Sequence, residues 1–139
     1  MGLLTTPATW QSGTFSRKRE NIAESPFLVL DFDKIPTTGK EPETPSQRRL
    51  LVCESLAITR WLRESCGWRL SAILWTGSKS LHIWFEMPPE DHVAALIKES
   101  MAPLGIDPSL IGMPEHPARL PGVIHKKTGK RSQTLWLQK

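Results

Sequence analysis

Hydrophobic positions in the first half of the chain predict one buried strand followed by one long helix. The run FLVLDF at residues 27–32 is continuously apolar up to its carboxylate, which is typical of a buried strand. Residues 35–45 hold three prolines, a glycine and three threonines, so we expect a long loop there. Apolar residues then recur at helical spacing over about residues 47–66, with Ser46 as the expected N-cap and Gly67 as the terminating residue.

The second half of the chain opens with two strands and a shorter helix. Apolar runs at about residues 68–75 and 81–87 are separated by the polar pentapeptide TGSKS, which predicts a hairpin. A second helix is expected over about residues 89–103, because acidic residues occupy its first turn and Gly105 follows its end. The two expected helices are therefore separated by a pair of strands.

The final part of the chain is expected to be irregular and then to close as a hairpin. Residues 106–118 contain three prolines, whereas residues 120–125 and 133–137 resemble short strands joined by a basic turn. The whole order favours an α+β fold with both helices on one face of a sheet, as in RRM-like and ferredoxin-like folds. A doubly wound parallel sheet fits less well, because the turn between the middle strands is too short for a parallel crossover.

Composition indicates one soluble globular domain over residues 1–139, since the chain is 39% hydrophobic and 23% charged. We expect an N-terminal arm over residues 1–25 and a folded core over residues 26–139. No apolar run reaches the roughly 18 residues that span a bilayer, and the N-terminus lacks the features of a secretory signal. Cys53 and Cys66 lie in the expected first helix without metal-binding spacing, so we expect reduced thiols in a cytoplasmic protein.

The net charge of +4 favours anionic partners without specifying one. Basic residues form three clusters, at residues 17–19, 48–49 and 125–131. One such cluster is typical of a solvated surface, but here three of them surround a pair of carboxylates.

Asp31 and Asp33 end the first strand one residue apart. Alternation along a strand points residues i and i+2 to the same face, so the two carboxylates converge and repel each other. A divalent cation removes that repulsion, and oxygen ligands suit Mg²⁺ or Mn²⁺. The alternative is a solvated strand end with Lys34 as a counter-charge.

The stretch TGSKSLHIWF has the composition of a phosphate-binding turn. Gly77 allows backbone N–H groups to approach a ligand closely, and hydroxyl, ammonium and imidazole groups surround it. The candidate nucleotide ligands in this stretch are Thr76, Ser78, Lys79, Ser80 and His82. The alternative is a tight hairpin with a polar tip.

A third stretch, ARLPGVIHKKTGK, combines a Pro-Gly turn with basic residues. Arg119 is suited to bidentate phosphate contact, and Lys126 to contact as a point charge. The alternative is a basic hairpin on the surface.

Taken together, LVLDFD, TGSKSLHIWF and ARLPGVIHKKTG resemble the three motifs of the archaeo-eukaryotic primase superfamily. They are most similar to the primase-polymerase domains of plasmids, phages and large DNA viruses, which read approximately hhhDhD, then SGGKGLH, then RhPGT with a downstream basic residue. The resemblance covers roughly residues 16–130. Two glycines of the second motif are replaced here by Ser78 and Ser80.

The resemblance implies a nucleotidyltransferase that makes primers on single-stranded DNA from nucleoside triphosphates, with a replicative helicase as a further partner. Asp31 and Asp33 would coordinate catalytic Mg²⁺ or Mn²⁺, and a third carboxylate would be Asp107, which we favour, or Glu115. The phosphate contacts would come from the second motif and from Arg119 and Lys126, residues of the third.

Six tryptophans and no tyrosine form an unusual aromatic set. Trp75 and Trp84 flank the polar turn and are candidates for stacking on the bases of a single strand. For the other tryptophans we expect core packing, above all for Trp61 on the apolar face of the first helix.

Three alternative classes share part of this pattern. A phosphohydrolase of the haloacid dehalogenase type also begins with hhhhDxD, but it requires Thr or Val where this chain has Ile35, and a late acidic pair that is missing here. The bacterial toprim domain requires a glutamate on an earlier strand, and Glu20 and Glu24 lie too close to Asp31 for that role. A non-catalytic nucleotide- or nucleic-acid-binding module of the primase type stays open.

Overall fold

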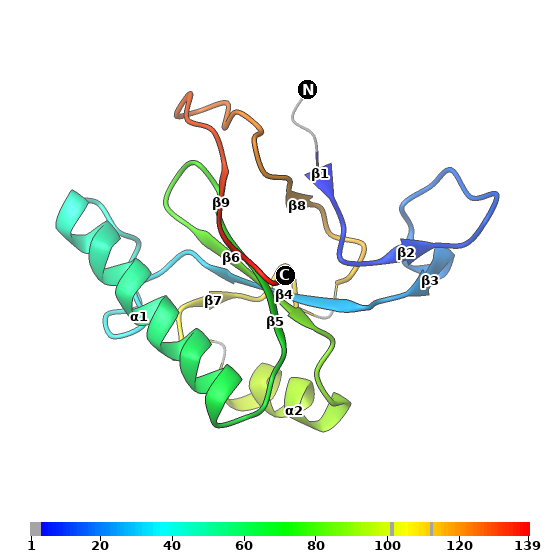
Figure 1. Cartoon of the computed structure of the whole chain (residues 1–139), viewed down its shortest axis with the longest axis horizontal. Helices are drawn as coiled ribbons and strands as arrows, with labels where there is room; N and C mark the ends of the chain where they lie inside the picture. The colour runs from blue at the N-terminus through cyan, green and yellow to red at the C-terminus, as the bar shows by residue number, and fades with distance from the viewer. Residues whose placement is uncertain (1–3, 101, 112) are drawn as a thin grey trace.

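A five-stranded antiparallel sheet forms the centre of the fold (Figure 1). The computed structural model describes residues 4–100, 102–111 and 113–139. The strands of this sheet are β4 (Phe27–Phe32), β5 (Leu70–Trp75), β6 (Leu81–Glu86), β7 (Ile106–Asp107) and β9 (Gln133–Leu137). Their spatial order is β7-β4-β6-β5-β9, and every neighbouring pair is antiparallel.

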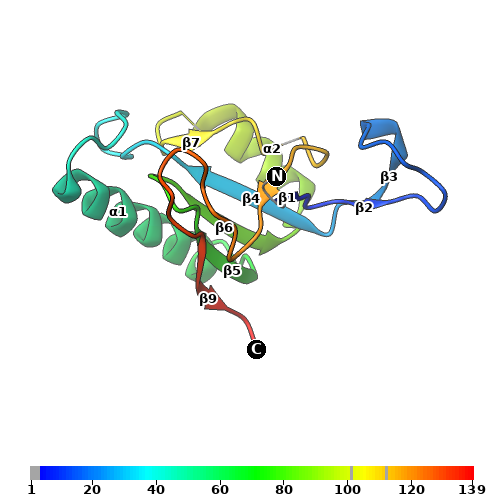
Figure 2. The ribbon, with the colours of Figure 1, turned by 90° about the horizontal axis from the view of Figure 1, so that it is seen from above.

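Two helices connect the strands and pack on one face of the sheet. Helix α1 (Pro45–Glu64) joins β4 to β5, and α2 (Glu90–Ala95) continues as the π-helical segment η2 (Leu96–Ser100) before β7. Strand β6 lies between β4 and β5, so the chain follows the order of a ferredoxin-like α+β fold, with β9 added at one edge. The predicted fold class is confirmed. Figure 2 shows the same elements from above.

Alternation along the central strands gives the sheet two different faces. Leu28, Leu30 and Phe32 of β4 point towards the helices and belong to the hydrophobic core. The same core includes Leu62 from α1 and Leu96 from the second helical segment. Burial of such a side chain contributes about 1.5–3 kcal/mol to the stability of the fold, so the face that packs against the helices stabilises the protein. The residues between these core residues in sequence point to the opposite face, which is where polar side chains can lie.

Helix α1 begins two residues earlier than predicted. Thr44, and not Ser46, is the N-cap: its hydroxyl accepts from the Gln47 backbone N–H, and the Gln47 side chain accepts from the Thr44 backbone N–H. This reciprocal capping box satisfies two helix-end donors at once, and Pro45 suits the first helical position. The helix ends at Glu64.

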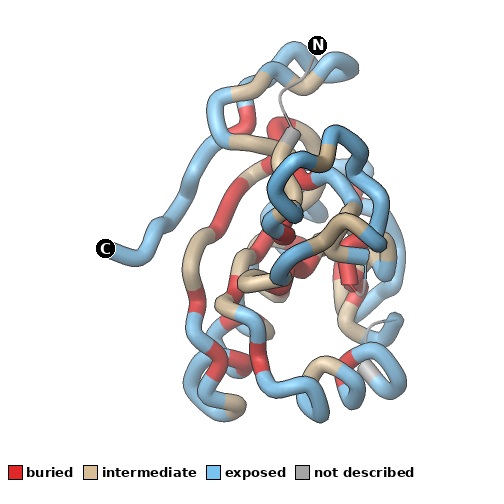
Figure 3. The backbone as a smooth tube through the Cα atoms, turned by 90° about the vertical axis from the view of Figure 1, so that its right-hand side faces the viewer, coloured by how far each residue is buried: buried red, intermediate tan, exposed pale blue. Residues whose placement is uncertain are grey.

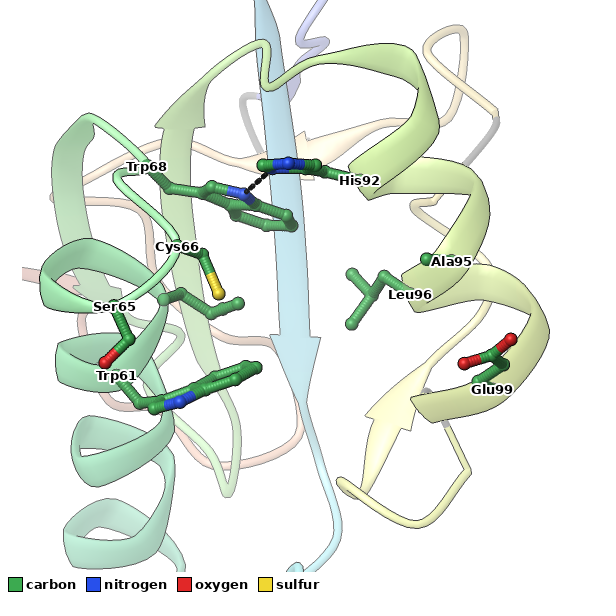
Figure 4. A pocket seen from close by; sticks show the side chains of 9 residues that line it. Trp61, Ser65, Cys66, Trp68, His92, Ala95, Leu96 and Glu99 are labelled. Carbon is green, nitrogen blue, oxygen red and sulfur yellow. Dashed lines mark hydrogen bonds between the residues drawn. The ribbon is translucent and has the colours of Figure 1, made fainter.

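The prediction that Trp61 packs in the core is wrong, because 54% of its surface is exposed. The buried face of α1 is instead formed by Leu51, Ser55, Thr59 and Leu62. Trp61 borders a cavity of about 360 Å³ between α1 and α2, where the indole N–H of Trp68 donates to His92 Nδ1 at 3.1 Å (Figure 4).

The N-terminal arm is more ordered than the sequence predicts. Strand β1 (Leu4–Thr5) pairs with β8 (Ala118–Arg119), and β2 (Thr9–Trp10) pairs with β3 (Ile22–Glu24), next to the short 3₁₀ helix η1 (Arg19–Asn21). Residues 1–3 of the expected arm lie outside the described residues. The pairing brings the arm to Arg119, on the face of the sheet that the helices leave free.

The closing part of the chain also differs from the prediction. A short hairpin exists around the bridge between Ile124 and Arg131, but residues 133–137 leave it and pair with the edge of β5. Pro121 lacks a backbone N–H and Gly122 adopts a turn, so a strand over 120–125 is not formed. Figure 3 shows the end of the chain as continuously exposed, which matches the exposure of every residue of β9.

Two further boundaries differ. Within the expected irregular stretch 106–118, Ile106–Asp107 form β7 against β4, and Ala118 belongs to β8. The expected helix 89–103 is described as helical over 90–100, and Met101 lies outside the described residues. Within those residues, no helix has both the length and the apolar character needed to cross a membrane.

Candidate active site

The first predicted site residue, Asp31, lies in the middle of the sheet with a polar neighbour on each side. It is paired with His82 on β6 and with Asp107 on β7. His82 Nε2 lies 3.4 Å from Asp31 Oδ2, and the His82 side chain is buried. These side chains belong to the face opposite the helices, since they alternate with the core residues of the same strands.

Asp33 follows the end of β4 and lies near the Lys79 ammonium group. The distance from Lys79 Nζ to Asp33 Oδ2 is 3.9 Å, whereas Lys79 Nζ is only 2.6 Å from Glu41 Oε1. Burial raises the pKa of Asp33, and the negative charge of Asp31 raises it further, with Lys79 partly offsetting both. Glu41 lies in the loop before α1, and sequence reasoning did not identify it because only the folded loop brings it to Lys79.

Asp107 has its own hydrogen-bond partner. The backbone N–H of Ser109 donates to Asp107 Oδ1 at 2.8 Å. Burial alone would raise the pKa of Asp107, but the hydrogen bonds from Ser109 outweigh it and hold the pKa below its ordinary value. The positive charge of Lys34 acts in the same direction. The ionised carboxylate is therefore the favoured form at this position.

Two carboxylate oxygens at the end of β4 fit a divalent cation. Asp31 Oδ1 and Asp33 Oδ1 are buried and have no hydrogen-bond partner, which is costly for oxygens of charged groups. Hard oxygen donors of this kind suit Mg²⁺ or Mn²⁺. Among residues 4–100, 102–111 and 113–139, however, no three His, Cys, Asp or Glu side chains are placed to share one ion. The ligand pair fits, and a third ligand is not brought to it.

A cavity of about 210 Å³ brings the three sequence motifs together. Its lining residues are Asp31, Thr76, Ser78, Lys79, Ser80, His82, Pro117, Arg119 and His125. Asp33, Asp107 and Lys126 do not line it, and Lys126 is exposed. His125, the neighbour of Lys126, lines the cavity.

The turn of the second motif is held in place by the basic turn of the third. Gly77 has φ +83°, and a Cβ atom added to it would lie 2.8 Å from the carbonyl oxygen of Lys130. The Thr128 hydroxyl donates to the Gly77 carbonyl oxygen at 2.6 Å. Glycine is required here both for the backbone conformation and for the close approach of the second chain segment.

Local hydrogen bonds complete the turn. The Trp75 indole N–H donates to the Ser78 carbonyl oxygen at 2.9 Å, and the Thr76 hydroxyl donates to the Ser80 carbonyl oxygen at 3.1 Å. The turn is thus stiffened from inside, while Ser78 and Lys79 still face the cavity.

His125 adds a neutral donor or acceptor to the cavity wall. Burial lowers its pKa, and the positive charges of Arg119 and Lys127 lower it further. Its Nδ1 atom is buried without a hydrogen-bond partner. His125 belongs to the basic cluster at residues 125–131 and to the third motif, and these are the features of the sequence that point to it.

The two candidate stacking residues lie in different surroundings. Trp84 is half-buried and packs edge-on against Phe27, with ring centroids 6.0 Å apart. Trp75 lies beside the polar turn, and Lys130 Nζ is 5.8 Å from its ring centroid. Of the two, Trp75 is the better placed for a base beside the turn.

No protein-family model, curated protein or solved structure matches this chain.

Proposed function

We propose that this chain is the catalytic core of a primase or primase-polymerase, an enzyme that joins nucleotides on a single-stranded DNA template by metal-dependent nucleotidyl transfer. The observation that carries the proposal is the common cavity. It brings Asp31 and His82 together with the hydrogen-bond donors of the polar turn and with Arg119 of the third motif. The resemblance of the three motifs to those of archaeo-eukaryotic primases supports the same reaction.

The charged side chains in and near the cavity would have separate roles in this reaction. Lys79, Ser78 and Arg119 would hold the triphosphate of the incoming nucleotide, because ammonium, hydroxyl and guanidinium groups donate to phosphate oxygens. Asp31 and Asp33 would hold Mg²⁺ or Mn²⁺. The bound cation would stabilise the charge on the entering and leaving oxygens at the α-phosphate. The remaining contribution of the chain is the positioning of charges.

In the cell, such a core would start strands during replication of a plasmid, phage or other mobile element. It would work in the cytoplasm beside a replicative helicase, with nucleoside triphosphates as substrates.

The proposal is tested by incorporation of labelled nucleotide on single-stranded DNA, with and without an annealed primer, in Mg²⁺ and in Mn²⁺. We expect product from the native chain, and a loss of at least a hundredfold in Asp31→Asn/Asp33→Asn, because oxyanion and metal contacts of this kind contribute roughly 10²–10³ in rate. Asp91→Asn, on the exposed surface of α2, is the matched control and should keep full activity. Product that persists in the double variant would refute the assignment of these carboxylates.

A non-catalytic nucleotide-binding module is the second candidate. Two observations favour it: Lys79 is engaged in an ion pair with Glu41 at 2.6 Å, and no third cation ligand joins Asp31 and Asp33 within the part of the chain that the structure describes. This candidate predicts triphosphate binding that Arg119→Gln weakens, with no incorporation under either metal. Binding without product in every lane would establish it and would sink the catalytic proposal.

A further inference from the structure

A second groove, of about 330 Å³, lies beside the nucleotide cavity at the start of α1. Its charged walls are Arg48 and Arg49 of α1, Lys79 of the polar turn and Lys130 of the basic turn, with Trp75 between them. Ser78 and Lys79 border both this groove and the cavity that contains Asp31, so the two are neighbours along one turn.

The charge of this groove works against the stability of the helix. Arg48 and Arg49 lie within the first five residues of α1, where the helix dipole favours anions and disfavours cations. The first turn of α1 contains no acidic residue, and neither arginine forms an ion pair with a carboxylate in the described part of the chain. An anionic ligand would compensate both cations at once.

The aromatic wall of the groove is held in a fixed orientation. The Trp75 indole N–H donates to the Ser78 carbonyl oxygen at 2.9 Å, and the ring remains partly exposed beside Lys130. A fixed aromatic ring among cations is the arrangement that holds a single nucleic-acid strand: bases stack on the ring and phosphates contact the cations. An acidic peptide would satisfy the charges but would not stack on the partly exposed indole ring.

We propose that this groove binds single-stranded nucleic acid, with its phosphates on Arg48, Arg49 and Lys130 and one base against Trp75. The proposal rests on the proposed function for its direction, since the shared Ser78 and Lys79 would lead the strand towards the nucleotide cavity. The template or primer strand would then reach the nucleotide cavity by passing the start of α1.

The test measures fluorescence anisotropy of a short fluorescein-labelled single-stranded oligonucleotide of mixed sequence. We expect Arg48→Gln/Arg49→Gln to bind about tenfold more weakly near 0.1 M salt, and the slope of log K against log salt to fall by about 1.4, which corresponds to two phosphate contacts. The matched control is Arg60→Gln/Arg63→Gln, which removes the same charge from the far end of α1 and should change neither value. All four arginines are exposed, so these changes leave the core intact.

The position of the strand is checked by photocross-linking an oligonucleotide that carries 5-iododeoxyuridine. The proposal expects the cross-linked peptide to contain Trp75. Equal strand binding by the two double variants, or a cross-link that maps only elsewhere, would overturn it. A loss of nucleoside triphosphate binding as large as the loss of strand binding would also overturn it, because the groove would then hold the free nucleotide. Competition by polyglutamate as strong as that by DNA would overturn the proposal too, because binding would then depend on negative charge alone.

Failure of this inference and failure of the proposed function give different results. If the native chain incorporates nucleotide but Arg48→Gln/Arg49→Gln binds the strand normally, only the groove assignment fails. If the double variant loses strand binding but the native chain makes no product, the groove assignment stands and the catalytic proposal fails.

Discussion

Replacement of Gly77 by alanine tests the contact between the two turns that form the cavity. Gly77 has φ +83°, and the new Cβ would lie 2.8 Å from the carbonyl oxygen of Lys130 and 3.3 Å from His125 Cβ. Both neighbours belong to the basic turn, so the added methyl group must push the two turns apart. The hydrogen bond from Thr128 to the Gly77 carbonyl oxygen would be lost with that movement.

The expected loss of unfolding free energy has three parts. A left-handed backbone conformation disfavours alanine by about 1–2 kcal/mol. Overpacking against a backbone carbonyl adds about 1–3 kcal/mol, and the lost hydrogen bond about 1 kcal/mol. We therefore expect Gly77→Ala to destabilise the protein by about 3–6 kcal/mol. Gly13 is the matched control, because it has φ +80° and no atom within 4 Å of an added Cβ. Gly13→Ala should therefore cost only the backbone part, about 1–2 kcal/mol of unfolding free energy.

Urea unfolding followed by circular dichroism measures both variants, and an unchanged m-value confirms that the same folded state is compared. Triphosphate binding by Gly77→Ala should fall as well, since the same turn presents Ser78 and Lys79 to the cavity. Losses for Gly77→Ala and Gly13→Ala that agree within about 0.5 kcal/mol would refute the close contact between the turns.

Two further predictions concern charge and helix capping. Because the pKa of Asp33 is raised, its ionised form costs stability at neutral pH, and stability falls as pH rises from the ordinary value of 3.8 through the raised pKa. Asp33→Asn should thus stabilise the protein at pH 7 but not below pH 3.8, and no gain at pH 7 in urea unfolding would contradict this. Mn²⁺ at a concentration ten times its Kd should add about 1.4 kcal/mol to the unfolding free energy of the native chain and nothing to that of this variant. Thr44→Ala should lower the unfolding free energy by about 1 kcal/mol, and Ser46→Ala by less than half as much, because Thr44 is the N-cap of α1. A larger loss of melting temperature for Ser46→Ala than for Thr44→Ala would show that the capping assignment is wrong.

The regular elements could be predicted because their patterns are local. The strand at residues 27–32 has the same bounds in the structure as in the prediction, and so does the strand at 133–137. The choice between Thr44 and Ser46 was also available in the sequence, since Thr44 and Gln47 have the spacing of a capping box and Pro45 follows the cap. Either residue type is a good N-cap, and only the glutamine three residues later distinguishes them.

The remaining features depend on contacts between distant parts of the chain. Ile106–Asp107 is too short to show a period, and it becomes a strand only because the edge of β4 offers hydrogen bonds. The exposure of Trp61 depends on how α2 lies beside α1, which its own helical spacing does not report. The contact of Glu41 with Lys79 likewise follows from the course of a loop rich in proline.

That the three motifs form one site was predicted only from their resemblance to the motifs of a known family. The sequence placed Asp31, the polar turn and Arg119 in order along the chain, and the structure brings them around one cavity. His125, the residue next to Lys126, lines that cavity, whereas Lys126 does not. A difference of one position in a short turn is beyond what a pattern of residue types can define.

The pairing register of β4 ties the geometry of the candidate site to the folding of the chain. Asp31 is held opposite His82 and Asp107 by the same ladder that directs Phe32 into the core. A slip of one residue would bury the carboxylates among apolar side chains and expose the phenylalanine, a change that both the core and the cavity would oppose. A chain that has reached its stable packing has therefore also placed these backbone positions next to each other. A library screened only for resistance to proteolysis would retain the backbone geometry of the site, whereas its carboxylates would be kept only under selection for a function that uses them.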